Sequence, residues 1–368
     1  MNRLALARLS RLGLAASLVT FTLSAHAVSR YEVQLIDVGS NAYFTPQALN
    51  DQGLIIGAVN SGQQGSTTRT AAVWSGGAWQ AIPHVDGGFH IEPHGVNNAG
   101  QVVGSDGGQA FIWQAGSTQK LSAFGPPSGA RAINDSGVAV GLDGSQAIQW
   151  TNGTAQALQR PAHLSSVQAR GINESGVIVG VGRLPGPAEA PTVALRWQGE
   201  QVSQLAQGDA VHAQATAVNE AGTVIGHAQF ADGREQAARW DGDSLSWLAQ
   251  LSPKATSRAL GINDAGLIVG QSKIWQDLAQ GTFLSRATLW EGTLAHDLSD
   301  WVDNGEGWTL SAAMGINASG QIVGVGLYQG KRAGFILSPV PEPTSLWMLG
   351  IGIAVVGMAG RHRASRQH

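Results

Sequence analysis

Cysteine is absent from this 368-residue sequence, so neither a disulfide nor a thiol nucleophile can contribute to its stability or chemistry. Charged residues make up only 13% of the chain, the formal net charge is −3, and no basic run occurs between residues 28 and 338, which argues against nucleic-acid binding. G-x-S-x-G, H-E-x-x-H and a glycine-rich phosphate loop in a βαβ setting are also missing. Burial of apolar side chains and pairing of strands must therefore hold the fold together.

What the sequence does contain is a ten-residue phrase that occurs seven times, at intervals of 37 to 54 residues. Its clearest copy, residues 171–180, is G-I-N-E-S-G-V-I-V-G. An apolar run, Asn-acid-x-Gly and a Val/Ile run predict two antiparallel strands joined by a tight turn, because Asn and Asp bond their own backbone and Gly adopts positive φ. The asparagines expected to build these structural turns are Asn50, Asn97, Asn134, Asn173, Asn219, Asn263 and Asn317.

A second motif, Ala-x-x-Trp, follows the phrase in six of the repeats, and Ile336 takes the place of Trp in the seventh. Gly-rich turn residues and a short strand come next, so each repeat should hold four strands. A buried Trp covers about 150–250 Å². We expect these tryptophans to form the contacts between neighbouring repeats.

The two ends of the repeat array are incomplete in a complementary way. Residues 31–39 are similar to the fourth strand of the other repeats, whereas the seventh repeat stops after its third strand. If the N-terminal strand completes the last repeat, the array closes into a ring with only short, protected edges. The sequence thus predicts an all-β fold, a seven-bladed β-propeller of four-stranded repeats over residues 28–338, with the last blade closed by the N-terminal strand. A linear β-solenoid is the alternative.

Propeller wiring then sorts the connections between strands. The turn within each phrase and the turn after each Trp lie on one face, called here the turn face. The other two connections of each repeat lie on the opposite face, called here the variable face. They carry nearly all the variation in length, at residues 82–94, 181–191, 273–283 and 300–308. Functional residues are expected on the variable face, because loops on a rigid scaffold usually carry function.

The termini differ in composition from the repeats. Residues 1–27 combine three arginines, an apolar run and an A-x-A exit, which predicts a cleaved signal helix. Residues 339–345 form a Pro-rich linker, residues 346–360 an apolar sorting helix that is short for a bilayer span, and residues 361–368 a basic tail. The sequence therefore predicts an exported protein whose C-terminal tail is transiently inserted in a membrane.

The C-terminal segment resembles the PEP-CTERM sorting signal, because Pro341, Glu342 and Pro343 precede the apolar helix and the basic end. This resemblance implies that an exosortase in the inner membrane of a Gram-negative bacterium recognises the tail and cuts near the motif. It also implies an extracellular or cell-surface location in an exopolysaccharide or biofilm matrix. The repeats are similar to the HAF family of extracellular bacterial repeats, through G-I-N-x-x-G-x-I-V-G and the Ala-x-x-Trp that follows it. The HAF resemblance carries over no catalytic residues.

Three histidines, His84, His90 and His94, share the 82–94 loop with Asp86 and Glu92. Imidazoles and carboxylates are ligands for zinc and other transition metals, so a metal site is chemically feasible. A polar loop punctuated by Gly and Pro is the simpler interpretation, and we expect neither a metal nor a cofactor.

Three residues before each repeat Asn lies a position expected at the mouth of the central channel on the variable face. The residues there are Gln47, His94, Arg131, Arg170, Thr216, Leu260 and Met314. His94, Arg131 and Arg170 fall in consecutive repeats and form a basic arc that could hold a carboxylate or sulfate. The alternative is that both arginines pair with nearby acids.

The variable loops also carry aromatic residues that are expected to be exposed: Tyr43, Phe44, Phe89, Phe230, Trp275, Trp301 and Trp308. Sugar rings stack on such side chains. We expect Trp275, Trp301 and Trp308 to contribute to ligand binding. The alternative is that these aromatics fill small cores beneath the loops.

Together these features predict a non-catalytic surface or matrix protein that binds extracellular polysaccharide or a protein partner through the variable face. The innermost strands repeat small, neutral residues where a propeller enzyme would place acids or histidines, which argues against catalysis. One alternative is an extracellular enzyme that acts on glycans through His90, His94 and Arg131. Another is a purely structural component of a biofilm matrix.

Overall fold

A computed structural model describes residues 30–340 of the chain except residues 64–65 and 278–279. The signal helix predicted at 1–27, the Pro341-Glu342-Pro343 motif, and the segments predicted at 346–360 and 361–368 lie outside the described residues. Among the described residues, no helix is both long and apolar enough to span a membrane.

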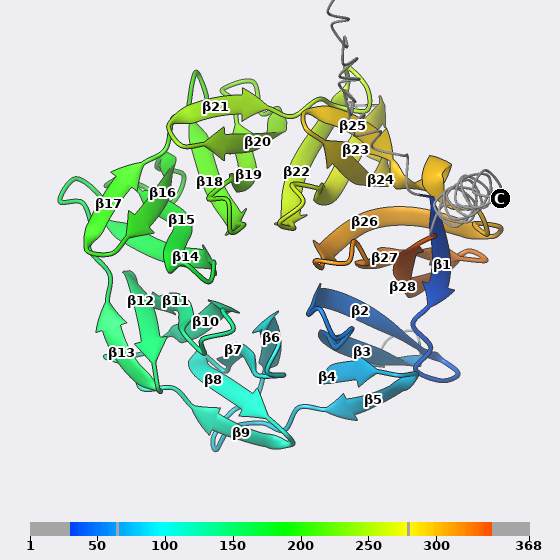
Figure 1. Ribbon diagram of the computed structural model, residues 1–368, viewed down its shortest axis with the longest axis horizontal. Coiled ribbons are helices and arrows are strands. Elements are labelled where there is room, and N and C mark those ends of the chain that lie inside the picture. Colours follow the sequence, from blue (N-terminus) through cyan, green and yellow to red (C-terminus); the bar gives the residue numbers. More distant parts are fainter. Residues whose placement is uncertain (1–29, 64–65, 278–279, 341–368) are drawn as a thin grey trace, which may run out of the picture. The chain divides into compact units, whose positions relative to one another are not determined.

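The described chain forms seven four-stranded blades around a central axis (Figure 1). Blades 1 to 7 are numbered by their innermost strands, which are β2 (Ala42–Leu49), β6 (Ile91–Val96), β10 (Ser128–Ile133), β14 (Ser166–Ile172), β18 (His212–Val218), β22 (Ala255–Ile262) and β26 (Trp308–Ile316). The second strands are β3 (Ile55–Gln63), β7 (Val102–Asp106), β11 (Ala139–Asp143), β15 (Val177–Arg183), β19 (Val224–Gln229), β23 (Ile268–Asp277) and β27 (Ile322–Tyr328).

The third strands, which carry the Ala-x-x-Trp motif in blades 1 to 6, are β4 (Ser66–Ser75), β8 (Gln109–Gln114), β12 (Gln146–Thr151), β16 (Thr192–Gln198), β20 (Glu235–Asp241), β24 (Thr282–Glu291) and β28 (Lys331–Pro339). The outermost strands are β5 (Ala78–Ala81), β9 (Ser117–Lys120), β13 (Thr154–Ala157), β17 (Gln201–Gln204), β21 (Ser244–Trp247), β25 (Leu294–Asp297) and, in blade 7, β1 (Tyr31–Leu35). A single turn of 3-10 helix, η1 (Leu298–Trp301), follows β25.

Strand β1 closes the ring. It pairs antiparallel with β28 in a register that places Tyr31 opposite Pro339 and Leu35 opposite Phe335. Blade 7 therefore has the strand order β1-β28-β27-β26, and its outer strand comes from the opposite end of the domain. The predicted seven-bladed propeller with a closing N-terminal strand is confirmed.

The hydrophobic core is divided among the interfaces between blades. Seven clusters of buried side chains each combine residues from two neighbouring blades, and one of them joins blade 7 to blade 1. The six motif tryptophans are 0–6% exposed. In blades 3 to 6 the Trp side chain also donates its Nε1–H to a backbone carbonyl of the preceding blade, at 2.6–2.8 Å. The motif thus joins blades through both apolar contact and hydrogen bonding.

The seven repeat asparagines form a closed ring of hydrogen bonds on the turn face. Each Nδ2 donates to the backbone carbonyl of the Asn in the next blade at 3.0–3.2 Å, and Asn317 donates back to Asn50. Each Oδ1 accepts the N–H of the residue four positions later at 2.8–3.0 Å, across its own turn. All seven side chains are buried. The asparagines therefore build the turns and also connect the blades, a second role that the sequence analysis missed.

The residue after each Asn adds a second set of contacts between blades. In six blades its side-chain oxygen accepts the backbone N–H of the equivalent residue in the preceding blade, at 2.5–2.9 Å. Ala318 occupies this position in blade 7 and has no side-chain acceptor to offer. A cavity of about 230 Å³ at this end of the axis is lined by the five carboxylates of this set: Asp51, Asp135, Glu174, Glu220 and Asp264.

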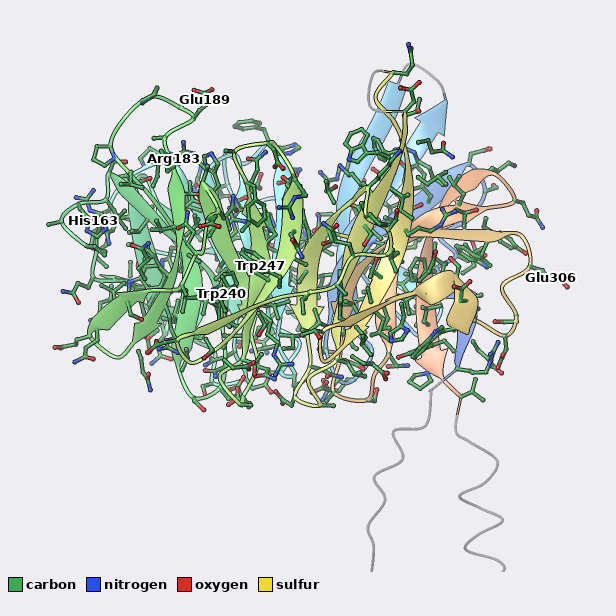
Figure 2. All side chains as sticks on the ribbon, turned by 90° about the horizontal axis from the view of Figure 1, so that it is seen from above. His163, Arg183, Glu189, Trp240, Trp247 and Glu306 are labelled. Carbon is green, nitrogen blue, oxygen red and sulfur yellow. The ribbon has the colours of Figure 1, made fainter. Side chains whose placement is uncertain are left out.

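The variable face is irregular and carries the longest connections. In Figure 2 the β3–β4 hairpin rises above the ring on the same side as the labelled Arg183 and Glu189. In the segment 273–283, expected to be a loop, residues 273–277 and 282–283 instead extend β23 and β24. The described chain begins and ends on the turn face, where the Val340 N–H donates to the Arg30 carbonyl at 2.8 Å.

Candidate functional site

Every inner strand contains a β-bulge just before its repeat Asn, where the pairing with the second strand shifts by one residue. Such a bulge leaves one residue unpaired and redirects its side chain. The unpaired residues are Gln47, His94, Arg131, Arg170, Thr216, Leu260 and Met314. All seven line a cavity of about 490 Å³, called here the axial cavity, at the variable-face end of the axis.

The last glycine of each phrase makes room for this bulge. A Cβ on Gly180 would lie 2.0 Å from the backbone oxygen of Gln168, far inside van der Waals contact. The equivalent glycine of every other blade approaches its inner strand as closely, at 1.9–2.1 Å: Gly57, Gly104, Gly141, Gly226, Gly270 and Gly324. The repeat glycines thus serve close packing as well as the turns expected from the sequence. The signal for the bulge was the fixed glycine at the tenth position of the phrase.

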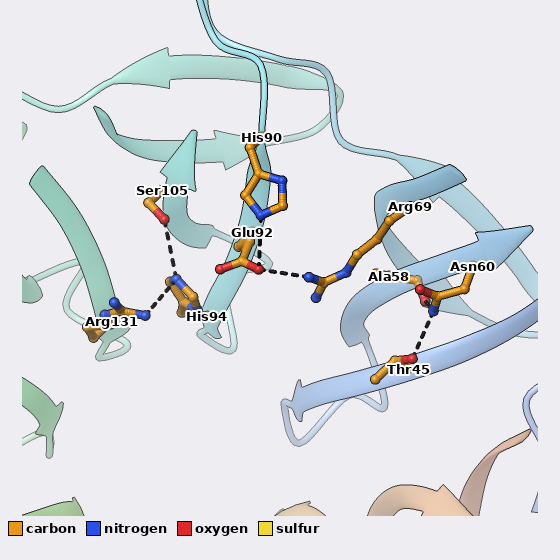
Figure 3. A network of polar contacts seen from close by, with 9 residues as sticks. All are labelled: Thr45, Ala58, Asn60, Arg69, His90, Glu92, His94, Ser105 and Arg131. Carbon is orange, nitrogen blue, oxygen red and sulfur yellow. Dashed lines mark hydrogen bonds and ion pairs between the residues drawn. The ribbon is translucent and has the colours of Figure 1, made fainter. Parts of the chain in front are cut away.

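His94 and Arg131 contact each other across blades 2 and 3 (Figure 3). Arg131 Nη1 lies 2.9 Å from His94 Nε2, and the Ser105 hydroxyl oxygen lies 3.5 Å from the same nitrogen. Burial, together with the charge of Arg131, lowers the pKa of His94 to about 4. His94 is therefore neutral at pH 7 and accepts a hydrogen bond from Arg131, so the positive charge of this pair resides on the guanidinium.

Arg170 extends the basic arc into blade 4. Burial lowers its pKa, and so do the charges of Arg131 and Arg258, although the guanidinium stays protonated at neutral pH. Within the described residues, neither Arg131 nor Arg170 has an ion pair with an acid. The alternative in which both arginines pair with acids is therefore wrong, and the axial cavity holds two cations with no carboxylate partner.

The three histidines of the 82–94 loop have separate partners. His84 Nδ1 lies 2.8 Å from the buried Asp106 carboxylate, which also accepts the backbone N–H groups of Val85 and His90 and so fixes the loop. His90 Nε2 lies 3.3 Å from Glu92, and His94 contacts Arg131. Among the described residues, no group of three or more histidine and acidic side chains could hold a metal ion.

The residues of the enzyme hypothesis belong to two different networks in Figure 3. Glu92 contacts both His90 and Arg69, and its distance to Arg69 Nη1 is 2.7 Å. Burial acts to raise the pKa of Glu92, but the hydrogen bond and charge of Arg69 outweigh burial and lower it. Glu92 is thus an ionised partner of Arg69, while His94 and Arg131 form their own pair on the axial cavity.

Trp275 lies on the β23–β24 hairpin, where it pairs across the strands with Phe283. The two ring centroids are 5.3 Å apart in an edge-to-face arrangement, and Lys273 Nζ lies 5.0 Å from the centre of the Phe283 ring. Phe283 is 42% exposed. Phe283 was not among the predicted aromatic residues, and its position across the strands from a Trp is the sequence signal that could have indicated it.

The other aromatics expected to be exposed divide into two groups. Trp301 and Trp308 are half-buried and pack against the core between blades 6 and 7, and Phe44 is fully buried between blades 7 and 1. Phe230 is half-buried, packs against Trp247 at 5.2 Å between ring centroids, and is covered by Arg234. Phe89 is 79% exposed. The packing interpretation therefore describes Trp301, Trp308, Phe44 and Phe230, whereas Trp275 is half-buried on the hairpin and Phe89 is largely exposed, with its ring beside Gly107.

Residues 339–364 match the model of the PEP-CTERM protein-sorting motif. This match implies an exported protein with a membrane-associated C-terminal sorting tail that is recognised by an exosortase. It begins at the last residue of β28, so the sorting segment follows the propeller directly.

Solved structures similar to this chain are β-propellers. The β-propeller domain of the Trilobed protease from Pyrococcus furiosus, reported to have an open velcro topology, is 11% identical with a TM-score of 0.51, covering 82% of this chain and 99% of that chain. A puromycin-hydrolyzing peptidase from Mycobacterium tuberculosis is 12% identical with a TM-score of 0.50, covering 77% of this chain and 49% of the peptidase. The sequence matches no curated protein. At these identities the similarity shows the fold alone.

Proposed function

We propose that this exported propeller is a non-catalytic binding protein of the bacterial cell surface or its matrix, and that it binds extracellular polysaccharide through the variable face. The observation that carries the proposal is the axial cavity, where neither Arg131 nor Arg170 makes an ion pair within the described residues. The acid whose charge acts on Arg131, Glu92, is paired with Arg69. Cations that are partly withdrawn from water and unpaired favour an anionic or strongly polar ligand. The turn face, in contrast, already uses its axial polar groups to join the blades.

The β23–β24 hairpin supports the same proposal. It presents Trp275 and Phe283 as an aromatic pair on the variable face, and rings of this kind stack on the apolar faces of sugars. The similarity of the repeats to HAF repeats and the PEP-CTERM match favour a location in a Gram-negative exopolysaccharide or biofilm matrix. A matrix protein is the alternative occupant of the same surface.

A glycan-binding experiment tests the proposal. The protein is titrated with neutral and acidic oligosaccharides and with matrix extracts, and products are analysed in the same samples so that any cleavage is detected. The double variant Trp275→Ala/Phe283→Ala should weaken glycan binding about tenfold and leave the thermal midpoint nearly unchanged. Trp301→Ala is the matched control, because this side chain packs on the core.

The control should lower stability without a specific effect on affinity. The proposal fails if no saccharide or matrix protein binds, or if the double variant binds as well as the wild type. Cleaved glycan that disappears in His94→Gln would instead favour the glycan-processing enzyme. Self-association without ligand binding, measured by sedimentation, would favour a purely structural matrix component.

A further inference from the structure

A second cavity, of about 390 Å³, opens beside the axial cavity on the variable face, and is called here the interblade pocket. It is lined by residues of blades 4, 5 and 6, and a single parallel bridge between Thr192 and His212 joins the first two of these blades. Arg170 lines both cavities. The interblade pocket thus borders the proposed ligand-binding surface at Arg170.

Three residues that line this pocket each carry a buried polar atom with no hydrogen-bond partner within the described residues: Arg170 Nε, Thr192 Oγ1 and His227 Nδ1. They are three of only seven such side-chain atoms in the described part of the chain. Buried polar groups are nearly always paired, because an unpaired group loses its hydration without compensation. Three such groups around one cavity are available to pair with a ligand.

The three groups share one chemical property, since each of them can donate a proton to a hydrogen bond. The Arg170 Nε–H and the Thr192 hydroxyl are donors, and a neutral imidazole is a donor at Nδ1 in one of its tautomers. His227 is neutral at pH 7, because burial and the charge of Arg258 lower its pKa to about 4. The missing partner is therefore an acceptor with several oxygens.

The net charge of the pocket also indicates the sign of the charge that its ligand should carry. Arg258 is neutralised by Glu235, with a bidentate contact at 2.5 and 2.8 Å. Arg183 donates to the Ala188 carbonyl, and neither Arg170 nor Arg183 has an acid partner within the described residues. Three arginines against one glutamate leave a formal charge of +2 around the pocket. An anion satisfies both the donors and the charge.

We propose that the interblade pocket binds the carboxylate or sulfate group of an acidic saccharide, with Arg170, Thr192 and His227 as the groups that contact the anion. The proposal deepens the proposed function and rests on it for the saccharide. Carboxylates and sulfates present two or three oxygens to converging donors. Gln214 and Gln229 also line the pocket and offer amide groups to sugar hydroxyls.

Calorimetric titration of the full-length protein in mild detergent tests this assignment. The probes are an oligouronate, the same oligomer with its carboxyl groups reduced to alcohols, and a sulfated oligosaccharide of equal length. Arg170→Gln should weaken binding of the acidic probes about tenfold and leave the neutral probe unchanged. Arg239→Gln is the matched control, because it removes the same charge from blade 5 at a residue that does not line the pocket. The second variant His227→Phe removes the Nδ1 donor and should also weaken acidic binding.

The outcomes separate this proposal from the proposed function. If neutral and acidic probes bind equally, or Arg170→Gln and His227→Phe bind acidic probes as the wild type does, the pocket assignment is overturned while glycan binding stands. If no oligosaccharide binds, the proposed function fails and the pocket is titrated with glucuronate and with inorganic sulfate alone. Binding of either that is lost in Arg170→Gln keeps the anion pocket, and no binding of either overturns it. A preference for uronate or for sulfated probes identifies which acidic group it takes.

Discussion

The two ends of the central channel are built by the same inner strands and differ in nearly every other respect. At the turn-face end, seven asparagines occupy equivalent positions and bond each to the next in a closed ring. At the variable-face end, three residues earlier on each strand, the equivalent positions hold seven side chains that include two arginines, one histidine and two apolar residues. One end is uniform and its polar groups are paired, whereas the other is diverse and leaves cationic groups unpaired.

This difference shows where the fold depends on identity between repeats. The hydrogen bond that runs from blade to blade ends on a backbone carbonyl, so a closed ring needs a side-chain amide donor at this position in every blade. The bulge that forms the axial cavity depends only on backbone shape and on a facing glycine. The residue on the bulge is therefore free to differ from blade to blade.

The largest expected effect on stability comes from a substitution that fills the space beside the bulge, which the phrase glycine leaves open. Gly180→Ala would place a Cβ 2.0 Å from the Gln168 carbonyl oxygen, and we expect a loss of about 3 kcal/mol in the free energy of unfolding, measured by chemical denaturation. Gly125→Ala is the control, because a Cβ there meets no atom within 4 Å and should change stability by less than about 0.5 kcal/mol. Equal stability of the two variants would contradict the role assigned to the phrase glycine.

A second substitution pair compares the two ends on one strand. Asn173→Ala removes the donor to the Asn219 carbonyl and the acceptor for the Val177 N–H, so it should cost about 2 kcal/mol. Arg170→Gln, three residues earlier, removes a partly buried cation without an acid partner and should change stability by no more than about 0.5 kcal/mol. The contrast between the ends would disappear if both variants were destabilised alike.

Acid should weaken the variable face before it weakens the fold elsewhere. His227 has a pKa of about 4 in the folded protein against an ordinary value of 6.5. As pH falls below 6.5 the unfolded chain takes up the proton first, so the stability present above pH 6.5 declines until the pH approaches 4. His227→Gln should remove about 1 kcal/mol of this decline between pH 7 and pH 5, after allowance for partial exposure of the ring. The burial of a neutral imidazole would be refuted if the free energy of unfolding fell equally steeply with decreasing pH in the wild type and in His227→Gln.

The smallest expected effect concerns the ion pair between Glu235 and Arg258. Among the described residues, Glu235 is the one acid that lines the interblade pocket, so this pair leaves Arg170 without an acid partner there. Burial acts to raise the pKa of Glu235, but the hydrogen bond and charge of Arg258 outweigh it and lower the pKa below 4.5. The stabilisation is therefore present above pH 4.5 and lost as pH falls through the folded-state value. Glu235→Gln should cost about 0.5 kcal/mol at pH 7, and this difference should vanish in acid. A difference that persists at low pH would show that packing, not charge, is responsible.

The fold could be predicted from the sequence because the ten-residue phrase occurs seven times and Ala-x-x-Trp six times at equivalent positions. Asn-acid-x-Gly gave the turns, Ala-x-x-Trp gave the blade contacts, and the complementary ends of the array indicated that β1 completes blade 7. Position within a repeat also placed the seven bulge residues together. Contacts between blades, such as Asn173 with Asn219, were not predictable from one repeat, because they depend on the rotation from each blade to the next.

The candidate site was less predictable for the same physical reason. Trp301 and Trp308 pack on the core, and nothing in the local sequence distinguishes them from Trp275 on its hairpin. The interblade pocket combines residues from three blades, and its defining feature is the lack of partners for Arg170, Thr192 and His227. Sequence shows which polar groups exist, whereas pairing between them depends on distances across blades.

The pairing of β1 with β28 also sets the order of events during biogenesis. The first strand of the propeller to be synthesised has no partner until a segment some 300 residues later has emerged. Ring closure is therefore the step with the greatest separation along the chain, and such contacts form late. The sorting segment begins where β28 ends, so an exosortase meets its motif only on a chain that already holds every strand of the ring. Recognition of that motif therefore concerns a domain whose last strand has already been synthesised.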